Sequence, residues 1–393
     1  MNYHIAVWLS VQNNQQLIGE MVCEIDASGK GRGAYRYTAD YLADPSAFPL
    51  DPVSLPLRTG TFETGHPGIF KLFEDSLPDD WGRRLLVRKH GIPRHEQNLP
   101  ALLLALGSTG LGALSYSESG KPENRSNSTS AIHLEELVRE AELFEQGKAE
   151  NHDLTLLFSA GSSPGGARPK ALVYDDATDR HYLAKFPSTK DSVDVVRLEA
   201  ATMGLAKRAG LTVPDRQLIE CAGKPVFLIE RFDITPSGRR HMISFQTLLK
   251  MEGYYVCRYQ DLLDVIRKFS AKPDIDSRLL YRQMVFNAVI GNTDDHLKNF
   301  WMTCDPVAGW RLSPSFDLVP DIAQNGDHVL RFDLDSHYPG REKLEKIGRG
   351  WGIHKASEVT EEVYAAVAQW KEEFAACGVC EADIIRFNDI EQR

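Results

Sequence analysis

The chain has 393 residues, 42% of them apolar and 25% charged, a composition that is typical of folded globular proteins and excludes a disordered or fibrous chain. Its longest apolar stretches are far shorter than the roughly 18 residues that span a bilayer, and its first residues lack the pattern of a secretory peptide, so we expect a cytoplasmic protein with no membrane contact. The formal net charge of −10 argues against broad, unaided binding to nucleic acid, and six scattered cysteines favour a reducing compartment over a disulfide framework.

The first third of the chain predicts a small β-rich region. Alternating residues over 4–12 and 17–26, followed by GAYRYTADYL, indicate an antiparallel sheet with polar turns. Residues 75–91 predict a helix, because acidic residues stand in its first turn and basic residues near its end, which suits the helix dipole. Residues 117–130 contain no core-forming side chain and predict a solvated linker, so residues 1–116 form the first expected domain.

The rest of the chain changes from mixed to helical. Residues 131–236 contain a predicted hairpin (RPKALVYDDATDRHYLAKFPS), an amphipathic helix closed by Gly210, and a buried strand over 224–233. Residues 237–393 repeat apolar side chains at steps of three and four residues in three segments, which predicts helices. We therefore expect an α+β chain with a mixed α/β amino-terminal half, a β-rich amino-terminal subdomain within it, and an all-helical carboxy-terminal lobe.

The stretch GNTDDHLKNFW, residues 291–301, places two Asp, one His, one Lys and two Asn directly after a predicted buried helix. Gly291 is a helix stop, so Asp294 to Asn299 are expected on a loop braced by that helix, where functional groups are commonly found. Four residues separate Asp294 from Asn299, which is the spacing of a protein-kinase catalytic loop. In that loop the Asp accepts the proton of the acceptor hydroxyl and the Asn binds Mg²⁺. A polar turn without chemistry is the alternative interpretation.

Three further residues fit the needs of phosphoryl transfer. Asp317, 18 residues after Asn299, follows a short apolar segment and is the predicted second ligand of Mg²⁺, which prefers oxygen ligands. Lys185 stands in the apolar run YLAKF, where a cation needs an anionic partner such as a phosphate. Glu199 lies in the next helix and is able to pair with Lys185. The alternatives are an exposed lysine on an edge strand and a solvated glutamate on the helix.

A Gly-rich segment supplies the remaining expected part of a nucleotide site. GSSPGGARPK, residues 161–170, offers backbone amides to phosphates, although it matches neither the Walker A motif nor the kinase Gly-rich motif, and a flexible turn is the alternative. The strand FLIERFD has a backbone that is able to hydrogen-bond adenine. The expected ATP contacts in these two segments are Ser162, Ser163, Pro164, Gly165, Gly166, Glu230, Phe232 and Asp233.

These motifs together resemble those of the HipA-type serine/threonine kinases, which are toxins of bacterial toxin–antitoxin modules. The matching stretches are SSPGGARPK, LAKFP, VFLIERFD, NTDDHLKNF and SPSFDLVP, in the family's order, and FEDSLPDDWGRRLL is similar to the family's amino-terminal signature. The resemblance runs from about residue 60 to residue 320. The stretch DSLPDD within the amino-terminal signature is more acidic than expected of the family. This difference bears on the contacts of the amino-terminal region and not on the expected phosphoryl transfer.

The resemblance implies a bilobal, protein-kinase-like fold with a nucleotide-binding lobe over 131–236 and a helical lobe with the catalytic loop over 237–393. It implies that Asp294 is the catalytic base, that Asn299 and Asp317 bind Mg²⁺, and that Lys185 grips the phosphates of ATP. His296 and Lys298, in the same loop, are expected to steady the transferring phosphoryl group. In the family a serine of the Gly-rich loop is autophosphorylated and the kinase switches off; Ser163 matches that position, and Ser162 is the alternative hydroxyl.

The resemblance further implies an ATP- and Mg²⁺-dependent kinase that phosphorylates a cytoplasmic protein, such as an aminoacyl-tRNA synthetase or another translation factor, and so arrests growth. It also implies a small DNA-binding antitoxin partner similar to HipB, through which this acidic chain would contact DNA. Two other functions stay open: a non-catalytic corepressor that bridges antitoxin dimers, and a small-molecule or lipid kinase. The joint presence of Lys185, Asp294, Asn299 and Asp317 argues against the corepressor, because a scaffold needs none of them.

Overall fold

The computed structural model describes residues 1–12, 14–65, 68–118, 129–160 and 168–393. The chain divides into two compact units. Unit 1 consists of Met1–Thr189, Glu230–Ile243 and Thr303–Gly309, and unit 2 consists of Lys190–Ile229, Ser244–Met302 and Trp310–Arg393. The expected mixed α/β class is confirmed, whereas the domain boundaries expected after residues 116, 130 and 236 stay predictions. No helix among the described residues is long and apolar enough to cross a membrane.

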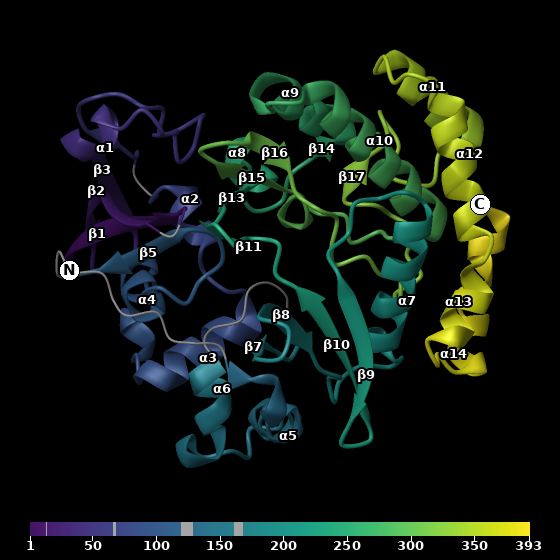
Figure 1. Cartoon of the computed structure of the whole chain (residues 1–393), viewed down its shortest axis with the longest axis horizontal. Coiled ribbons are helices and arrows are strands. Elements are labelled where there is room, and N and C mark those ends of the chain that lie inside the picture. Colours follow the sequence, from purple (N-terminus) through teal and green to yellow (C-terminus); the bar gives the residue numbers. More distant parts are fainter. Residues whose placement is uncertain (13, 66–67, 119–128, 161–167) are drawn as a thin grey trace. The chain divides into compact units, whose positions relative to one another are not determined.

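Unit 1 begins with the antiparallel sheet that the alternating residues predict, coloured purple to blue in Figure 1. Its strand order is β4-β3-β2-β1-β5. One side of the sheet buries an aromatic cluster in which the rings of Tyr35, Tyr37 and Phe73 meet edge to face or tilted. The strands are β1 (Asn2–Val11), β2 (Asn14–Ile25), β3 (Gly31–Tyr37), β4 (Phe62–Glu63) and β5 (Leu114–Ser117).

Two predicted elements of unit 1 differ from the structure. The segment GAYRYTADYL leaves the sheet after Tyr37, because the Thr38 side chain caps the short helix α1 (Ala39–Ala43). The helix predicted over 75–91 begins at Asp80, because the residue before Pro78 is disfavoured in helical conformation. The unit's helices are α1, α2 (Lys71–Asp75), α3 (Asp80–His90), α4 (Leu99–Leu106), α5 (Leu134–Glu145) and α6 (Thr155–Ala160).

The predicted hairpin of the mixed region is confirmed in unit 1. β7 (Lys170–Asp175) pairs antiparallel with β8 (Arg180–Lys185), and β6 (Thr129–Ser130) runs parallel to β7 on its other side. A second, shorter hairpin joins β11 (Ile234–Thr235) to β12 (Gly238–Arg239).

Unit 2 is built mainly of helices. Helices α7 and α10 pack against α12 and α13, which lie along the yellow edge of Figure 1. Its helices are α7 (Val195–Arg208), α8 (Phe245–Leu248), α9 (Tyr259–Phe269), α10 (Pro273–Ile290), α11 (Arg341–Gly350), α12 (Ala356–Val367), α13 (Trp370–Ala376) and α14 (Glu381–Ile385). It also contains the hairpin of β9 (Arg216–Cys221) and β10 (Lys224–Glu230), apart from Glu230, which belongs to unit 1; β10 is the predicted buried strand.

The carboxy-terminal lobe is not entirely helical. Two short strands, β14 (Cys257–Arg258) and β17 (Leu330–Arg331), pair in parallel within unit 2. Three other strands contain residues of both units: β13 (His241–Ser244), β15 (Trp301–Asp305) and β16 (Gly309–Leu312). The expectation of an all-helical lobe is wrong in this respect, because strands of two to five residues leave no periodicity against a helical background.

Candidate active site

The predicted catalytic loop begins where helix α10 ends. The helix ends at Gly291, whose φ of +75° is left-handed, and the amide of Asn292 closes the last turn by donating to the Asn287 carbonyl at 2.9 Å. Asp294 follows on an irregular segment with its side chain 78% exposed. The predicted stop and the predicted loop are therefore confirmed, and the loop then tightens into one 3₁₀ turn over Leu297–Asn299.

The predicted catalytic residues Asp294 and His296 are neighbours on this loop. His296 Nε2 lies 3.7 Å from Asp294 Oδ1, so the imidazole and the carboxylate are neighbours. Lys298 is half-buried, and its carbonyl accepts a hydrogen bond of 2.6 Å from Trp301 Nε1. An exposed carboxylate beside an imidazole suits a group that receives a proton from a hydroxyl near anionic phosphates.

Asn299 is tied directly to the catalytic loop. Its side chain is buried, and Nδ2 donates to the Asp294 carbonyl at 2.8 Å, while its backbone amide donates to the His296 carbonyl at 2.8 Å. The first bond fixes the plane of the amide group and uses its nitrogen, so Oδ1 is the atom of Asn299 that is able to ligate a cation.

Asp317 has an unusual backbone conformation. Its φ of +55° is left-handed, a conformation that costs a non-glycine residue energy and occurs preferentially at functional positions. The segment before it is held in place because Ser315 donates from its hydroxyl to Gln283 of α10 at 2.9 Å and from its amide to the Thr212 carbonyl at 2.8 Å. The half-buried Asp317 carboxylate therefore stands on a braced segment of the same unit as Asn299.

The residues present fit a magnesium ion that the nucleotide helps to hold. Among the described residues, no group of three or more His, Cys, Asp and Glu side chains forms a metal site. Mg²⁺ in kinases needs no such cage, because one or two protein oxygens, the phosphates of the nucleotide and water complete its shell. Asn299 Oδ1 and the Asp317 carboxylate are oxygen donors of the required kind.

The neighbour of Asp294 was not singled out from the sequence. Asp295 is fully buried, and its carboxylate accepts four hydrogen bonds, from Tyr259, His328, Val329 and Leu330. The two consecutive aspartates of the loop thus have opposite environments. No local sequence signal distinguishes them, because every donor to Asp295 lies more than 30 residues away along the chain.

Two predicted phosphate-site residues lie on the expected elements. Lys185 is the last residue of β8, half-buried, and is paired in register with Lys170 of β7. Glu199 lies on α7 with 3% exposure, so the alternative of a solvated glutamate is wrong. Lys185 belongs to unit 1 and Glu199 to unit 2, and the expected ion pair between them stays a prediction.

The expected adenine segment begins at the last residue of strand β10. Glu230 forms an ion pair with Arg180 at 2.9 Å, and Phe232 is half-buried. Asp233 is fully buried against Arg231, with bonds of 3.0 and 2.6 Å to its two oxygens, and it also accepts from the amide of Gly112 at 2.8 Å. Burial alone would raise the pKa of Asp233, but the Arg231 guanidinium outweighs it and holds the pKa below its usual value. The Asp233 side chain therefore stabilises the fold. A hydrogen bond between adenine and the backbone of this segment stays a prediction.

The expected phosphate contacts of the Gly-rich loop lie outside the described residues. They are Ser162, Ser163, Pro164, Gly165 and Gly166.

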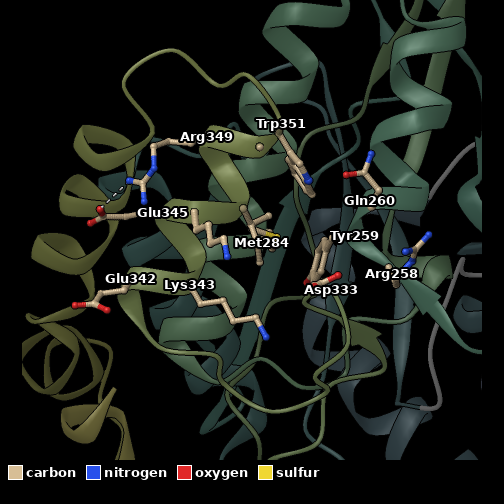
Figure 2. A pocket seen from close by; sticks show the side chains of 13 residues that line it. Arg258, Tyr259, Gln260, Met284, Asp333, Glu342, Lys343, Glu345, Arg349 and Trp351 are labelled. Carbon is tan, nitrogen blue, oxygen red and sulfur yellow. Dashed lines mark hydrogen bonds and ion pairs between the residues drawn. The ribbon is translucent and has the colours of Figure 1, made fainter.

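A cavity of about 810 Å³ lies elsewhere in unit 2, between the start of α9 and α11. Figure 2 shows Tyr259 and Gln260 on one side of it, Lys343 and Glu345 on the other, and Met284 between them. None of the predicted site residues that the structure describes lines this cavity. Tyr259 connects it to the catalytic loop, through the hydroxyl that donates to Asp295 at 2.6 Å.

Comparisons with known proteins identify two family domains along the chain. The HipA N-terminal domain matches residues 9–117, and the HipA-like C-terminal domain matches residues 162–370, which is more than half of the chain. The serine/threonine-protein kinase toxin HipA of Shewanella oneidensis is 25% identical over 82% of this chain and 77% of its own length. The Sinorhizobium fredii protein Y4mE is 30% identical over 36% of this chain, and the match spans 34% of that relative.

The fold is also that of a solved structure. The complex of S. oneidensis HipA with HipB and operator DNA contains a chain that matches with a TM-score of 0.67 at 19% identity, over 98% of this chain and 94% of that chain. The similarity of fold therefore extends over both units. With the two family domains in order along the sequence and this fold in space, the chain belongs to the HipA family.

Proposed function

We propose that the chain is an ATP-dependent serine/threonine protein kinase that phosphorylates a cytoplasmic protein, such as an aminoacyl-tRNA synthetase or another translation factor, and thereby arrests growth. The observation that carries the proposal is the bond from Asn299 Nδ2 to the Asp294 carbonyl, which ties the expected metal ligand to the expected base on one short loop. The kinase name of the S. oneidensis relative supports the same class of reaction.

In the proposed reaction, the hydroxyl oxygen of a serine or threonine bonds to the γ-phosphorus of ATP while the bond from that phosphorus to the ADP oxygen breaks. The hydroxyl proton passes to the Asp294 carboxylate, which is exposed and therefore accessible to a protein substrate. Asn299 and Asp317 would hold Mg²⁺, which when bound neutralises phosphate charge. Lys185 would contact the phosphates, and His296 and Lys298 would stabilise charge on the transferring group.

The proposal includes self-inhibition through the Gly-rich loop. Phosphorylation of Ser163 adds roughly −1.5 to −2 charge beside a site for the anionic phosphates of ATP. Repulsion between these charges would weaken nucleotide binding and switch the kinase off. Ser162 is the alternative acceptor.

We also assign the chain a HipB-like antitoxin partner. HipA of S. oneidensis forms a complex with HipB and operator DNA, and that chain has the same fold. A net charge of −10 makes direct, unaided DNA binding by this chain unfavourable, so its DNA contact is expected to run mainly through the partner.

The test is incubation of the purified chain with Mg²⁺ and γ-labelled ATP, beside the Asp294→Asn variant, followed by mass mapping of phosphorylated residues. We expect phosphate on Ser163 in the native chain and a rate lower by about 10²- to 10⁴-fold in the variant, because a positioned base contributes that much. Phosphate on Ser162 alone would identify Ser162, in place of Ser163, as the site of self-inhibition.

Other outcomes point to the two alternative functions. A chain that binds ATP but phosphorylates neither itself nor protein acceptors, while it phosphorylates a small molecule or lipid, would replace the protein kinase by a kinase of that acceptor. A chain that does not bind ATP would contradict any kinase and leave the non-catalytic corepressor.

A further inference from the structure

The two consecutive aspartates of the catalytic loop have opposite solvent exposure. Asp294 is 78% exposed, whereas Asp295 is 0% exposed. Burial of a carboxylate is unfavourable unless hydrogen bonds replace the lost water, and a carboxylate has room for about four of them. Asp295 has all four, so its burial is compensated in full.

The four bonds are divided evenly between the two oxygens of Asp295. Oδ2 accepts from the hydroxyl of Tyr259 at 2.6 Å and lies 3.0 Å from Nδ1 of His328. Oδ1 accepts from the backbone amides of Val329 and Leu330 at 2.8 and 3.1 Å. Since both oxygens are held from two sides, the carboxylate cannot rotate without breaking bonds, and it fixes the backbone of the loop against α9 and β17.

A second set of bonds connects this anchor to α10. Asn287 Nδ2 donates to the Tyr259 hydroxyl at 3.0 Å, and Asn292 Nδ2 donates to Asn287 Oδ1 at 3.1 Å. Asn292 starts the same loop that carries Asp295, so the bonds form a closed ring through Tyr259, Asn287 and the loop. All three asparagine and tyrosine side chains of this ring are buried, where such bonds are stronger than in water.

The anchor lies one peptide bond from two groups of the proposed reaction. Asp294 precedes Asp295 directly, and the Asp294 carbonyl accepts the side-chain amide of Asn299. A shift of the Asp295 backbone would therefore move the expected base and turn the expected metal ligand at the same time. On the opposite flank, the Leu297 amide donates to the Tyr255 hydroxyl at 3.0 Å, which holds the loop from its other end.

We infer that Asp295 is a positioning residue of the phosphotransfer site, and that it acts through the Tyr259 hydroxyl and the 329–330 amides to hold Asp294 and Asn299 in reacting geometry. The inference rests on the proposed kinase function. Misplacement of a reacting group by about 1 Å costs up to a hundredfold in rate, so loosening this anchor must slow the transfer step.

The test compares two tyrosine variants. Tyr259→Phe removes the hydroxyl that donates a hydrogen bond to Asp295. Tyr281→Phe removes an equally buried hydroxyl that bonds Leu344 and Thr360 instead. The rate of self-phosphorylation at saturating Mg²⁺ and ATP, the half-saturating ATP concentration, the thermal midpoint, and the hydrogen exchange of the Val329 and Leu330 amides are measured in both. Asp295→Asn, which keeps the shape of the side chain, is the third variant.

We expect Tyr259→Phe and Asp295→Asn to be slower by about tenfold to a hundredfold at saturating ATP, with faster exchange at Val329 and Leu330. Tyr281→Phe should stay within about twofold of the native rate even where its thermal midpoint falls as far. Equal loss of rate in both tyrosine variants, or native rate and native exchange in folded Tyr259→Phe and Asp295→Asn, would overturn the positioning role alone. An inactive native chain would overturn the proposed function, and the positioning role with it.

Discussion

At the scale of single residues, His241 is a histidine that the core of unit 1 keeps neutral. It is 1% exposed, its ring packs near Phe48, and Nε2 donates to the Leu50 carbonyl at 2.7 Å. Burial lowers the pKa of His241 to about 4, although the bond to Leu50 acts in the opposite direction. The unfolded chain therefore takes up a proton below about pH 6.5 that the folded chain does not take up until about pH 4.

This difference in proton uptake predicts a loss of stability on acidification. The contribution of His241 is complete above pH 6.5 and declines by up to about 1.4 kcal/mol for each pH unit as the pH falls toward 4. Urea denaturation of the native chain and of His241→Gln at pH 7, 6 and 5 measures this contribution of His241 to the free energy of unfolding. The native free energy of unfolding should fall more steeply than that of the variant, and parallel declines would contradict the neutral buried histidine.

The residue scale also marks the limit of what the sequence could predict about the site. The spacing of Asp294 and Asn299 was visible because both lie within one short stretch. The role of Asp295 was not visible, because Tyr259 lies 36 residues before it and His328 lies 33 residues after it. A buried and an exposed aspartate are identical in a sequence until the partners that surround one of them are known.

At the scale of elements, the left-handed end of α10 makes a further prediction. Gly291 ends α10 at φ +75°, and Gly91 ends α3 in the same conformation at φ +61°. Alanine at either position should lower the free energy of unfolding by about 1–2 kcal/mol, because a Cβ is unfavourable in this conformation. At Gly291 the Cβ would in addition displace the Arg393 guanidinium, whereas at Gly91 it would meet open space. Only Gly291→Ala should also slow self-phosphorylation, since the catalytic loop starts there. Equal rates of self-phosphorylation in the two variants would show that the end of α10 does not control the geometry of the catalytic loop.

Elements were predictable where their own residues determine them. Helix α10 has a long buried pattern and a glycine stop, and the β7–β8 hairpin has two apolar runs around a polar turn, so both were found from the sequence. The parallel pair of β14 and β17 was not, because each strand has two residues and its partner is more than 70 positions away. That pair nevertheless stands next to the amides that hold Asp295.

At the scale of the whole molecule, nucleotide binding should be measurable as stability. A ligand at 100 times its dissociation constant adds about 2.7 kcal/mol to a folded protein that binds it. We therefore expect Mg²⁺ with ATP to raise the thermal midpoint, and a chelator of Mg²⁺ to remove most of that increase.

Two aspartates with the same backbone conformation provide the matched comparison. Asp317→Asn should lose most of the Mg²⁺-dependent increase, because it removes a charged ligand of the ion. Asp333→Asn should keep it, since Asp333 also has a left-handed φ, of +65°, but lines the cavity beside α11. If the thermal midpoint of the Asp317→Asn variant rose as much as that of the native chain, Asp317 would not be a ligand in the proposed magnesium site.

Tyr259 has one more consequence, which concerns inhibitors. Its ring lines the cavity beside α11, and its hydroxyl holds the anchor of the catalytic loop (Figure 2). A compound that enters this cavity and displaces the ring would detach the loop without occupying the place of ATP. By linkage, its affinity and the order of the loop would depend on each other. Raising the ATP concentration would not restore activity in the way it does against a competitor at the nucleotide site.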